Sequence, residues 1–298
     1  MKKKYSKQGF IEFGKIIYVL VLMLLPMYSI GQITFERIFG GISSESSYKV
    51  EICPDGGYIT AGYTRSSGLG DASMHLIKTD KYGFQQWESV FGGNGVDYAY
   101  SLAVTDDGGC VAVGSTTSFG GMQANIYVVK VDEKGNKIWE KYFDGAGKDE
   151  GWDIRLTNDK GFIITGVTNS WGAKFNDVFL LKIDSDGNEL WKKLYGGSSV
   201  DGGFCVRQTP DGGYAVLGQT HSMGEGLGDF YFFKTDADGN QQWEKTYGGE
   251  MPEEGRYFSL TNDGGFVLVG KTESFGAGDE DIYVVKTNSS GELEWSKT

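Results

Sequence analysis

The sequence predicts an all-β protein built from one repeated unit, and three observations predict it. A tryptophan recurs every 52 residues, and so does an aspartate that opens a DGG or DKG step. Beyond residue 31 there is no sustained helical period, and short β-rich apolar segments alternate with glycine-containing turns. The tryptophans are Trp87, Trp139, Trp191, Trp243 and Trp295, and the aspartates are Asp55, Asp107, Asp159, Asp211 and Asp263.

The fourth copy of the repeat displays its four expected strands clearly. The first and second are FCVRQT (204–209) and YAVLGQT (214–220), joined by a PDGG turn. A glycine-rich loop leads to DFYFFKTD (229–236), and an ADGN turn leads to QQWEKTY (241–247). The second and third are apolar on both faces, which predicts strands covered on both sides. The fourth mixes Trp with Glu and Lys, which predicts an exposed sheet edge.

Four antiparallel strands in about 50 residues, repeated without insertion from Phe35 to Thr298, are typical of a β-propeller blade. A β-solenoid competes, but its coils usually need about half this length. We therefore predict a domain of five blades over residues 32–298, with repeats ending near the five tryptophans. The segment ITFERIFGG (33–41) aligns with a fourth strand, which makes six fourth strands for five sets of the other three. Either one is a surplus edge strand, or the chain is part of a larger ring.

Residues 1–31 have the composition of a signal peptide. Five lysines precede an apolar run of about fifteen residues, and Ser29 and Gly31 place small residues where signal peptidase cleaves. The alternative is a retained membrane anchor, but the run is short for a span and contains Pro26. We expect an exported protein with no membrane insertion after the signal is removed.

The charge of the expected mature chain excludes some partners. Removing residues 1–31 takes away five lysines and Glu12, which leaves 23 basic against 39 acidic residues and a net charge of −16. Such a surface repels nucleic acid and anionic lipid. The cysteines Cys53, Cys110 and Cys205 are odd in number and are not spaced as a disulfide framework, so we expect no structurally important disulfide.

The repeats resemble kelch-type and quinoprotein-type propeller blades. Gly218, Tyr231 and Trp243 match the kelch glycine, tyrosine and tryptophan, although the diglycine is displaced to Gly212-Gly213. The stretch from Asp80 to Trp87 is similar to the quinoprotein motif but one residue shorter. The whole unit is more similar to DGGY…TxSFG…DxYLVKTDxxGxxxW repeats of exported proteins of Gram-negative bacteria. This resemblance implies a propeller that is secreted or at the cell surface, or in the periplasm, and implies no activity.

One rim of the predicted propeller carries the candidate binding residues. An acid recurs in what we expect to be the loop before each first strand, and three residues later a large side chain recurs at the expected channel mouth. The loops after the second strands add further aromatic residues. Carboxylates beside aromatic rings can bind a cation or a sugar. The alternative is structural, because such acids commonly bond loop amides. The acids are Glu45, Asp97, Asp149, Asp201 and Glu253, the large side chains are Tyr48, Tyr100, Trp152, Phe204 and Arg256, and the loop aromatics are Phe119, Trp171 and Phe275.

Few catalytic chemistries fit the sequence. His75 and His221 occupy unrelated repeat positions, which argues against a zinc site or a histidine triad. The SDGN and ADGN turns lack the ligand order of a calcium loop, so we assign no metal or cofactor, with calcium left open. Departures from the repeat are where an enzyme site would lie, and the sharpest is Glu150, Trp152, Asp153 and Arg155, with Arg207 and Arg256 in later copies.

The sequence therefore favours a binding or adhesion module for an extracellular glycan or protein and assigns no catalytic residue. The alternatives are a glycosidase-like enzyme that uses rim carboxylates, and a purely structural surface repeat.

Overall fold

The structure is a computed structural model that describes residues 34–121, 123–173 and 175–298. The chain divides into one unit that ends at Phe35 and a second that spans Glu36–Thr298. The predicted signal peptide lies outside the described residues, so that prediction remains open. The second unit carries all the strands described below.

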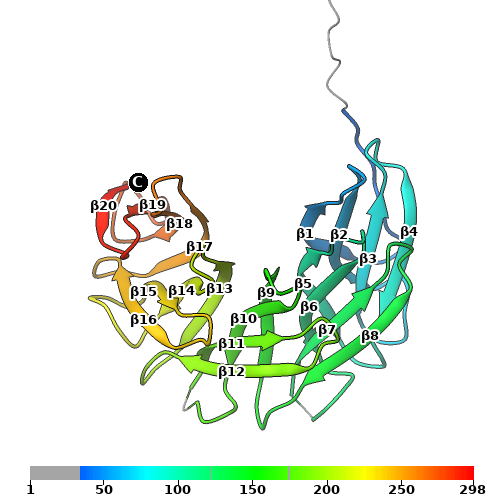
Figure 1. Cartoon of the computed structure of the whole chain (residues 1–298), viewed down its shortest axis with the longest axis horizontal. Coiled ribbons are helices and arrows are strands. Elements are labelled where there is room, and N and C mark those ends of the chain that lie inside the picture. Colours follow the sequence, from blue (N-terminus) through cyan, green and yellow to red (C-terminus); the bar gives the residue numbers. More distant parts are fainter. Residues whose placement is uncertain (1–33, 122, 174) are drawn as a thin grey trace, which may run out of the picture. The chain divides into compact units, whose positions relative to one another are not determined.

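The second unit consists of five four-stranded antiparallel sheets, each made from consecutive strands, as predicted (Figure 1). We call them blades 1 to 5. Blade 1 holds β1 (Glu45–Ile52), β2 (Tyr58–Thr64), β3 (Ser73–Thr79) and β4 (Gln85–Phe91). Blade 2 holds β5 (Asp97–Val104), β6 (Cys110–Thr116), β7 (Asn125–Val131) and β8 (Lys137–Phe143). Blade 3 holds β9 (Asp149–Leu156), β10 (Phe162–Thr168), β11 (Asp177–Ile183) and β12 (Glu189–Tyr195). Blade 4 holds β13 (Asp201–Gln208), β14 (Tyr214–Thr220), β15 (Asp229–Thr235) and β16 (Gln241–Tyr247), and blade 5 holds β17 (Glu253–Leu260), β18 (Phe266–Thr272), β19 (Asp281–Thr287) and β20 (Leu293–Lys297).

The second and fourth strands have the predicted bounds in blade 4, and the third differs by one residue. The first strand begins three residues earlier than predicted, at Asp201. The recurring acid therefore opens the strand and does not lie in the loop before it, because Asp201 pairs with Thr220 at the end of β14. Gly202 and Gly203 lie in this part of the strand and have no side chains, so the pattern of apolar residues did not predict a strand there.

The tight turns between the third and fourth strands are held by hydrogen bonds to an aspartate side chain. The Asp184 carboxylate accepts hydrogen bonds from the amides of Asp186 and Asn188, at 2.9 and 2.8 Å. Gly187 follows with a φ of 79°, a conformation that glycine adopts without strain.

The hydrophobic core is divided among the contacts between successive blades. The forward face of a blade, meaning the side that packs against the next one, is formed in blade 1 by Ile59, Ala61, Met74 and Leu76. It packs against the rear face of blade 2, formed by Leu102, Ala112, Tyr127 and Val129. Equivalent clusters join blades 2 and 3, 3 and 4, and 4 and 5. This explains why the second and third strands are apolar on both faces.

The recurring tryptophan joins neighbouring blades. The Trp87 indole N–H donates to the carbonyl of Glu133 in blade 2, at 2.9 Å, and Trp139 donates to Ser185 in blade 3, at 3.2 Å. Each indole lies against a turn glycine of the next blade, and a Cβ on Gly135 would approach the Trp87 ring to 2.7 Å. The repeat thus places one large apolar side chain across each contact.

Residues 36–41 form no strand, although this segment aligns with fourth strands. No sheet in the described part of the chain has a fifth strand, so the expectation of a surplus edge strand is not met there. The segment lies instead beside blade 1, where the Arg37 guanidinium is 4.9 Å from the centre of the Phe84 ring.

Within residues 34–298, apart from 122 and 174, no helix has the length and apolar character needed to cross a membrane. Cys53, Cys110 and Cys205 are buried and are not joined by a disulfide.

Candidate binding face on the inner strands

The first strands of the five blades lie against one another, and each contains a β-bulge. A bulge leaves one residue outside the pairing and redirects its side chain. The bulged residues are Tyr48, Tyr100, Trp152, Phe204 and Arg256, which are the five that we predicted at the channel mouth. Repetition of the bulge explains why one repeat position delivers side chains to the same inner face.

In blades 3 to 5 these residues form a stack. The Trp152 and Phe204 rings are parallel to within 4°, with centres 4.8 Å apart. The Arg256 guanidinium lies 4.7 Å from the centre of the Phe204 ring and pairs with Glu254 at 2.7 Å. We call Trp152, Phe204 and Arg256 the Trp152 stack. Both aromatic rings are only half-buried, so this stack is accessible to a ligand.

In blades 1 and 2 the same position belongs to a cluster of four tyrosines. Tyr48 contacts Tyr100 and Tyr63, with ring centres 5.5 and 6.1 Å apart, and Tyr98 contacts Tyr63 at 4.9 Å. Tyr48 is 52% exposed. Burial raises the pKa of Tyr100 to about 12, so its hydroxyl is neutral at physiological pH.

The recurring acids are tied to their own blades. Asp97, Asp149, Asp201 and Glu253 are fully buried, and Glu45 is half-buried. Asp97 accepts hydrogen bonds from Thr116, from Ser118 at 2.7 Å and from the amide of Gly93 at 2.9 Å. Thr116 and Ser118 are the threonine and serine of the T-x-S pattern at the end of the second strand, so these bonds support the structural alternative for Asp97. Ligand binding by the five recurring acids stays a prediction.

The loop aromatics pack onto the third strand of their own blade. Phe119 contacts Tyr127 at 5.5 Å, Trp171 contacts Phe179 at 5.9 Å, and Phe275 contacts Tyr283 at 5.4 Å. Phe275 is 42% exposed. Their contacts are therefore separate from the Trp152 stack, and ligand binding by them stays a prediction.

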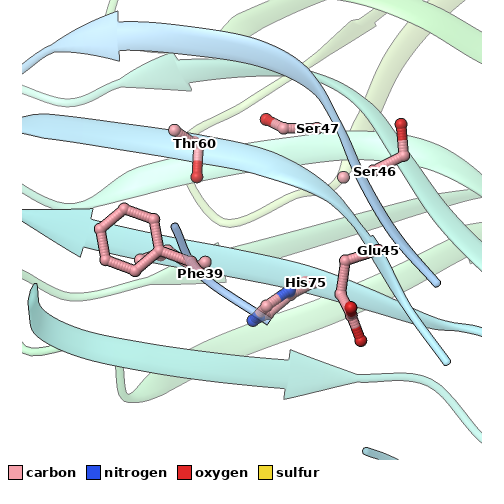
Figure 2. A pocket seen from close by; sticks show the side chains of 8 residues that line it. Phe39, Glu45, Ser46, Ser47, Thr60 and His75 are labelled. Atoms are coloured by element: carbon pink, nitrogen blue, oxygen red, sulfur yellow. The ribbon is translucent and has the colours of Figure 1, made fainter. Parts of the chain in front are cut away.

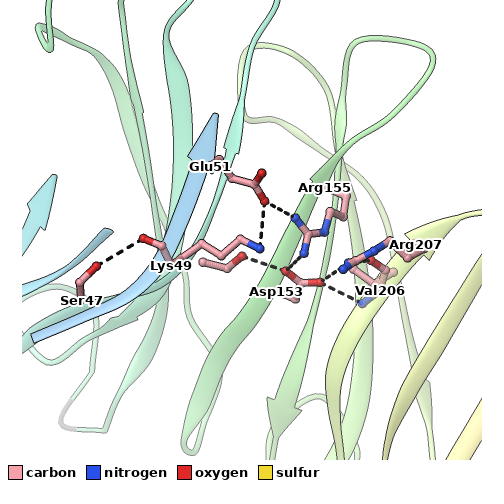
Figure 3. Close-up of polar contacts among 8 residues, drawn as sticks. Ser47, Lys49, Glu51, Asp153, Arg155, Val206 and Arg207 are labelled. Carbon is pink, nitrogen blue, oxygen red and sulfur yellow. Dashed lines mark hydrogen bonds and ion pairs between the residues drawn. The ribbon is translucent and has the colours of Figure 1, made fainter. Parts of the chain in front are cut away.

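An inner polar cluster joins blades 1, 3 and 4 (Figure 3). The Arg155 guanidinium lies 3.0 Å from a Glu51 oxygen and 3.1 Å from an Asp153 oxygen. The other Asp153 oxygen is 2.9 Å from Arg207, and Lys49 is 2.9 Å from Glu51. The sequence indicated Asp153, Arg155 and Arg207 as departures from the repeat. It did not indicate Lys49 or Glu51, although both also break the repeat at their positions.

The charges of this cluster are paired, although its three cations, Lys49, Arg155 and Arg207, outnumber its two carboxylates by one. Burial acts to raise the pKa of Glu51, but Lys49 and Arg155 outweigh it and lower that pKa. Burial likewise acts to lower the pKa of Arg155, but Asp153 and Glu51 contribute to raising it overall. A glycosidase acid needs a carboxyl group whose pKa is raised, and Glu51 is shifted in the opposite direction. Glu51 is therefore poorly suited to the role of a glycosidase acid.

In residues 34–298, apart from 122 and 174, no group of three or more His, Cys, Asp or Glu side chains is arranged to hold a metal ion. A buried acid and a half-buried acid do approach each other between blades 3 and 4. A Cβ on Gly196 would lie 2.5 Å from an Asp201 oxygen and 3.1 Å from an Asp177 oxygen. Burial, followed by Asp201, raises the pKa of Asp177.

No family model matches the sequence, and no curated protein matches it. Solved structures do match in fold. A protein of unknown function from Bacteroides caccae matches with a TM-score of 0.50 at 10% identity, over 86% of this chain and 82% of that one. A puromycin hydrolase matches with a TM-score of 0.50 at 10% identity, over 85% of this chain and 38% of that one. The β-propeller domain of a trilobed protease from Pyrococcus furiosus matches with a TM-score of 0.44 at 9% identity, over 84% and 69%.

The chain is a β-propeller. Five antiparallel four-stranded sheets in chain order, packed face against face, decide this. Sequence identities of 9–10% to these structures support a shared fold only. The function must therefore be argued from the site.

Proposed function

We propose that this propeller is an exported binding module that holds an extracellular glycan on the inner-strand face of blades 3 to 5. The observation that carries the proposal is the Trp152 stack, in which half-buried rings and the paired Arg256 lie on strands fixed by two blade contacts. Aromatic faces provide apolar area for the C–H face of a sugar, and ion-paired side chains beside them can hydrogen-bond its hydroxyls.

A glutamate lies two residues before Trp152 on β9, and another lies two residues before Arg256 on β17. Glu150 pairs with Lys148 at 3.0 Å and Glu254 pairs with Arg256 at 2.7 Å, and both glutamates are largely buried. Such held carboxylates lose little conformational entropy when a ligand binds. Export is supported by the predicted signal peptide and by the resemblance to exported repeats of Gram-negative bacteria.

A protein partner is the second candidate. Tyr48 and Tyr257 expose 52% and 44% of their surface on the first strands of blades 1 and 5, and tyrosine is enriched at protein interfaces. A glycosidase that uses Glu51 as its acid is less well supported, because Glu51 in the inner polar cluster is paired and its pKa is lowered.

The test is a glycan array probed with residues 32–298. We expect binding to one glycan class that falls at least tenfold in Trp152→Ala and persists in Trp152→Phe, which keeps an aromatic ring. The matched control is Trp295→Ala, which removes an exposed tryptophan on β20, outside the stack. Thermal unfolding of each variant checks that the fold is retained. Glycan binding that Trp152→Ala leaves unchanged would overturn the proposed site, and binding only to a protein would favour the second candidate.

A further inference from the structure

Among the described residues, none covers the forward face of blade 5 as a following blade would. Ile282 on β19 is 70% exposed, although the residues at the same repeat position in the other blades are fully buried against the next blade. Val267, Val269 and Val284 on the same face are half-buried. The four buried equivalents of Ile282 are Met74, Ile126, Val178 and Phe230. Blade 5 thus presents the type of surface that four other blades bury in a blade-to-blade contact.

Blade 1 leaves the opposite type of surface incomplete. Val50 on β1 is 55% exposed, whereas its equivalents Leu102, Ile154, Val206 and Phe258 are at most 1% exposed. A cavity of about 180 Å³ opens on this rear face, between Phe39, His75 and Ile77 (Figure 2). On the rear face of blade 2 the corresponding space is filled by Met74 and Leu76 of blade 1. The cavity therefore lies where the forward face of a preceding blade would pack.

Residues 36–41 lie beside this cavity as an unpaired fourth strand would. Phe39 occupies the repeat position of Phe91, which packs against the core between blades 1 and 2. A Cβ on Gly40 would meet the Glu45 side chain at 2.8 Å, just as one on Gly92 would meet Asp97 at 2.1 Å. Residues 36–41 therefore have the repeat position and the contacts of a fourth strand, but they are not preceded by three described strands of the same blade.

We propose that these two surfaces bind one further unit of the same repeat, three strands long, for which residues 36–41 supply the fourth strand. The unit would pack its rear face on Ile282 of blade 5 and its forward face into the cavity of blade 1. This inference is independent of the proposed glycan site. Four contacts of the same kind within the chain show the chemistry that such a unit must offer, namely an apolar side chain at each forward and rear position.

A second copy of the chain fits this place less well. It would bring a complete blade with its own fourth strand, so that two fourth strands would compete for the position of residues 36–41. A three-stranded unit has no fourth strand of its own, so it does not compete with residues 36–41. It would also pair the backbone of residues 36–41, which has no sheet partner among the described residues.

The experiment joins a copy of residues 247–287 to Thr298, which continues the 52-residue phase. We expect amide hydrogen exchange in residues 36–41 and 282–285 to slow at least tenfold relative to the original chain. The matched control carries Leu268→Asp and Val285→Asp in the added copy alone, which removes its apolar rear face, and we expect it to exchange like the original chain. Unchanged exchange in the extended chain would overturn the proposal.

A second experiment tests the proposal without the extended chain, in case that chain does not fold. Residues 247–287, fused to a soluble carrier protein, are tested for retention by the original chain and by its Ile282→Asp variant. We expect retention by the original chain and at least a tenfold loss with the variant. Absence of retention, or retention that ignores Ile282→Asp, would contradict the proposal. Sedimentation of the original chain as a dimer that Ile282→Asp dissociates would assign the surface to a second copy instead.

Discussion

The Lys182 ammonium group lies 3.0 Å from both carboxylate oxygens of Asp159, with only 4% of the lysine side chain exposed. The same pair joins the third strand of a blade to the turn after its first strand in three other blades. In blade 2 the equivalent Lys130 instead donates to the carbonyl of Ser185 in blade 3, at 3.0 Å. A lysine that crosses the apolar interior to reach a turn aspartate is therefore a recurring support of the blade.

Replacing Asp159 with asparagine should reduce stability in a pH-dependent way. Burial acts to raise the pKa of Asp159, but hydrogen bonds from Thr157 and Lys182 lower it to about 2. A lowered pKa contributes stability above the unfolded value of about 4, and that contribution is lost as the pH falls from about 4 to about 2. The Asp159 side chain is 58% exposed, so screening reduces the expected loss for Asp159→Asn at pH 7 to about 1 kcal/mol.

Urea unfolding at pH 7 and pH 3 measures this effect. The difference between wild type and Asp159→Asn should shrink at the lower pH. Combining Asp159→Asn with Lys182→Met in a double-mutant cycle isolates the pair, and a coupling energy near zero would contradict the assignment.

Asp177→Asn should stabilise the protein at neutral pH. Burial and the neighbouring Asp201 raise the pKa of Asp177, so the folded chain disfavours its ionised form. A raised pKa means that stability is lost as the pH rises through the folded value, and asparagine removes that loss. Asn125 already occupies this repeat position in blade 2. We expect a gain of about 0.5–1 kcal/mol at pH 7 that disappears at acid pH.

The measurement is urea unfolding of both proteins, in EDTA and again with calcium chloride. A destabilised variant in EDTA would contradict the expected sign. Calcium that stabilised the wild type but not Asp177→Asn would show that a cation neutralises Asp177 and Asp201.

Asp97→Ala should destabilise the protein strongly even with no ligand present. The buried carboxylate accepts from Thr116, Ser118 and the amide of Gly93, and alanine leaves all three donors without it. We expect a loss of about 3 kcal/mol by chemical denaturation. Asp106→Ala is the control, since Asp106 is 71% exposed and contacts Lys160 at the surface. Equal stability of both variants would argue against the structural role of Asp97.

The repeat made the fold predictable because each blade contact uses the same positions. Trp87 and Trp139 recur at one phase, and both contact the next blade. The start of the first strand was missed because Gly202 and Gly203 have no side chain to show alternation, and backbone pairing with β14 extends the strand through them. The residues that recur every 52 positions thus predict the contacts between blades, whereas the exact start of the first strand depends on backbone pairing.

The candidate site was only partly predictable. The inward direction of Trp152 depends on a bulge opposite Thr165 and Gly166, which apolar patterning does not reveal. The pairing of Glu51 with Arg155 joins residues 104 positions apart, so it depends on the curvature of the whole blade series. Lys182 and Asp159 did recur at fixed phases, and that spacing would have predicted the ion pair had the lysine been followed as closely as the tryptophan.

Trp139→Ala and Trp295→Ala should differ although they occupy the same repeat position. Trp139 is half-buried, packs against blade 3 and donates a hydrogen bond to Ser185. Trp295 is 44% exposed on β20, beyond which no blade is described. We expect Trp139→Ala to cost about 3 kcal/mol and Trp295→Ala less than about 1 kcal/mol. Chemical denaturation measures both, and equal losses would mean that Trp295 is packed in solution.

Gly218→Ala should prevent folding or cost more than about 4 kcal/mol, because an alanine methyl group has no space at this position. A Cβ on Gly218 would lie 1.8 Å from the carbonyl oxygen of Gly202, a backbone atom of the paired strand that cannot rotate away. Gly212→Ala is the matched control. Its φ of 86° strains alanine, but nothing lies within 4 Å of the added Cβ, so a loss of about 1 kcal/mol is expected. Far-ultraviolet circular dichroism and urea unfolding compare the two. If Gly218→Ala were as stable as Gly212→Ala, the first strand of blade 4 would have to lie farther from β14 than the pairing of Gly203 with Gly218 allows.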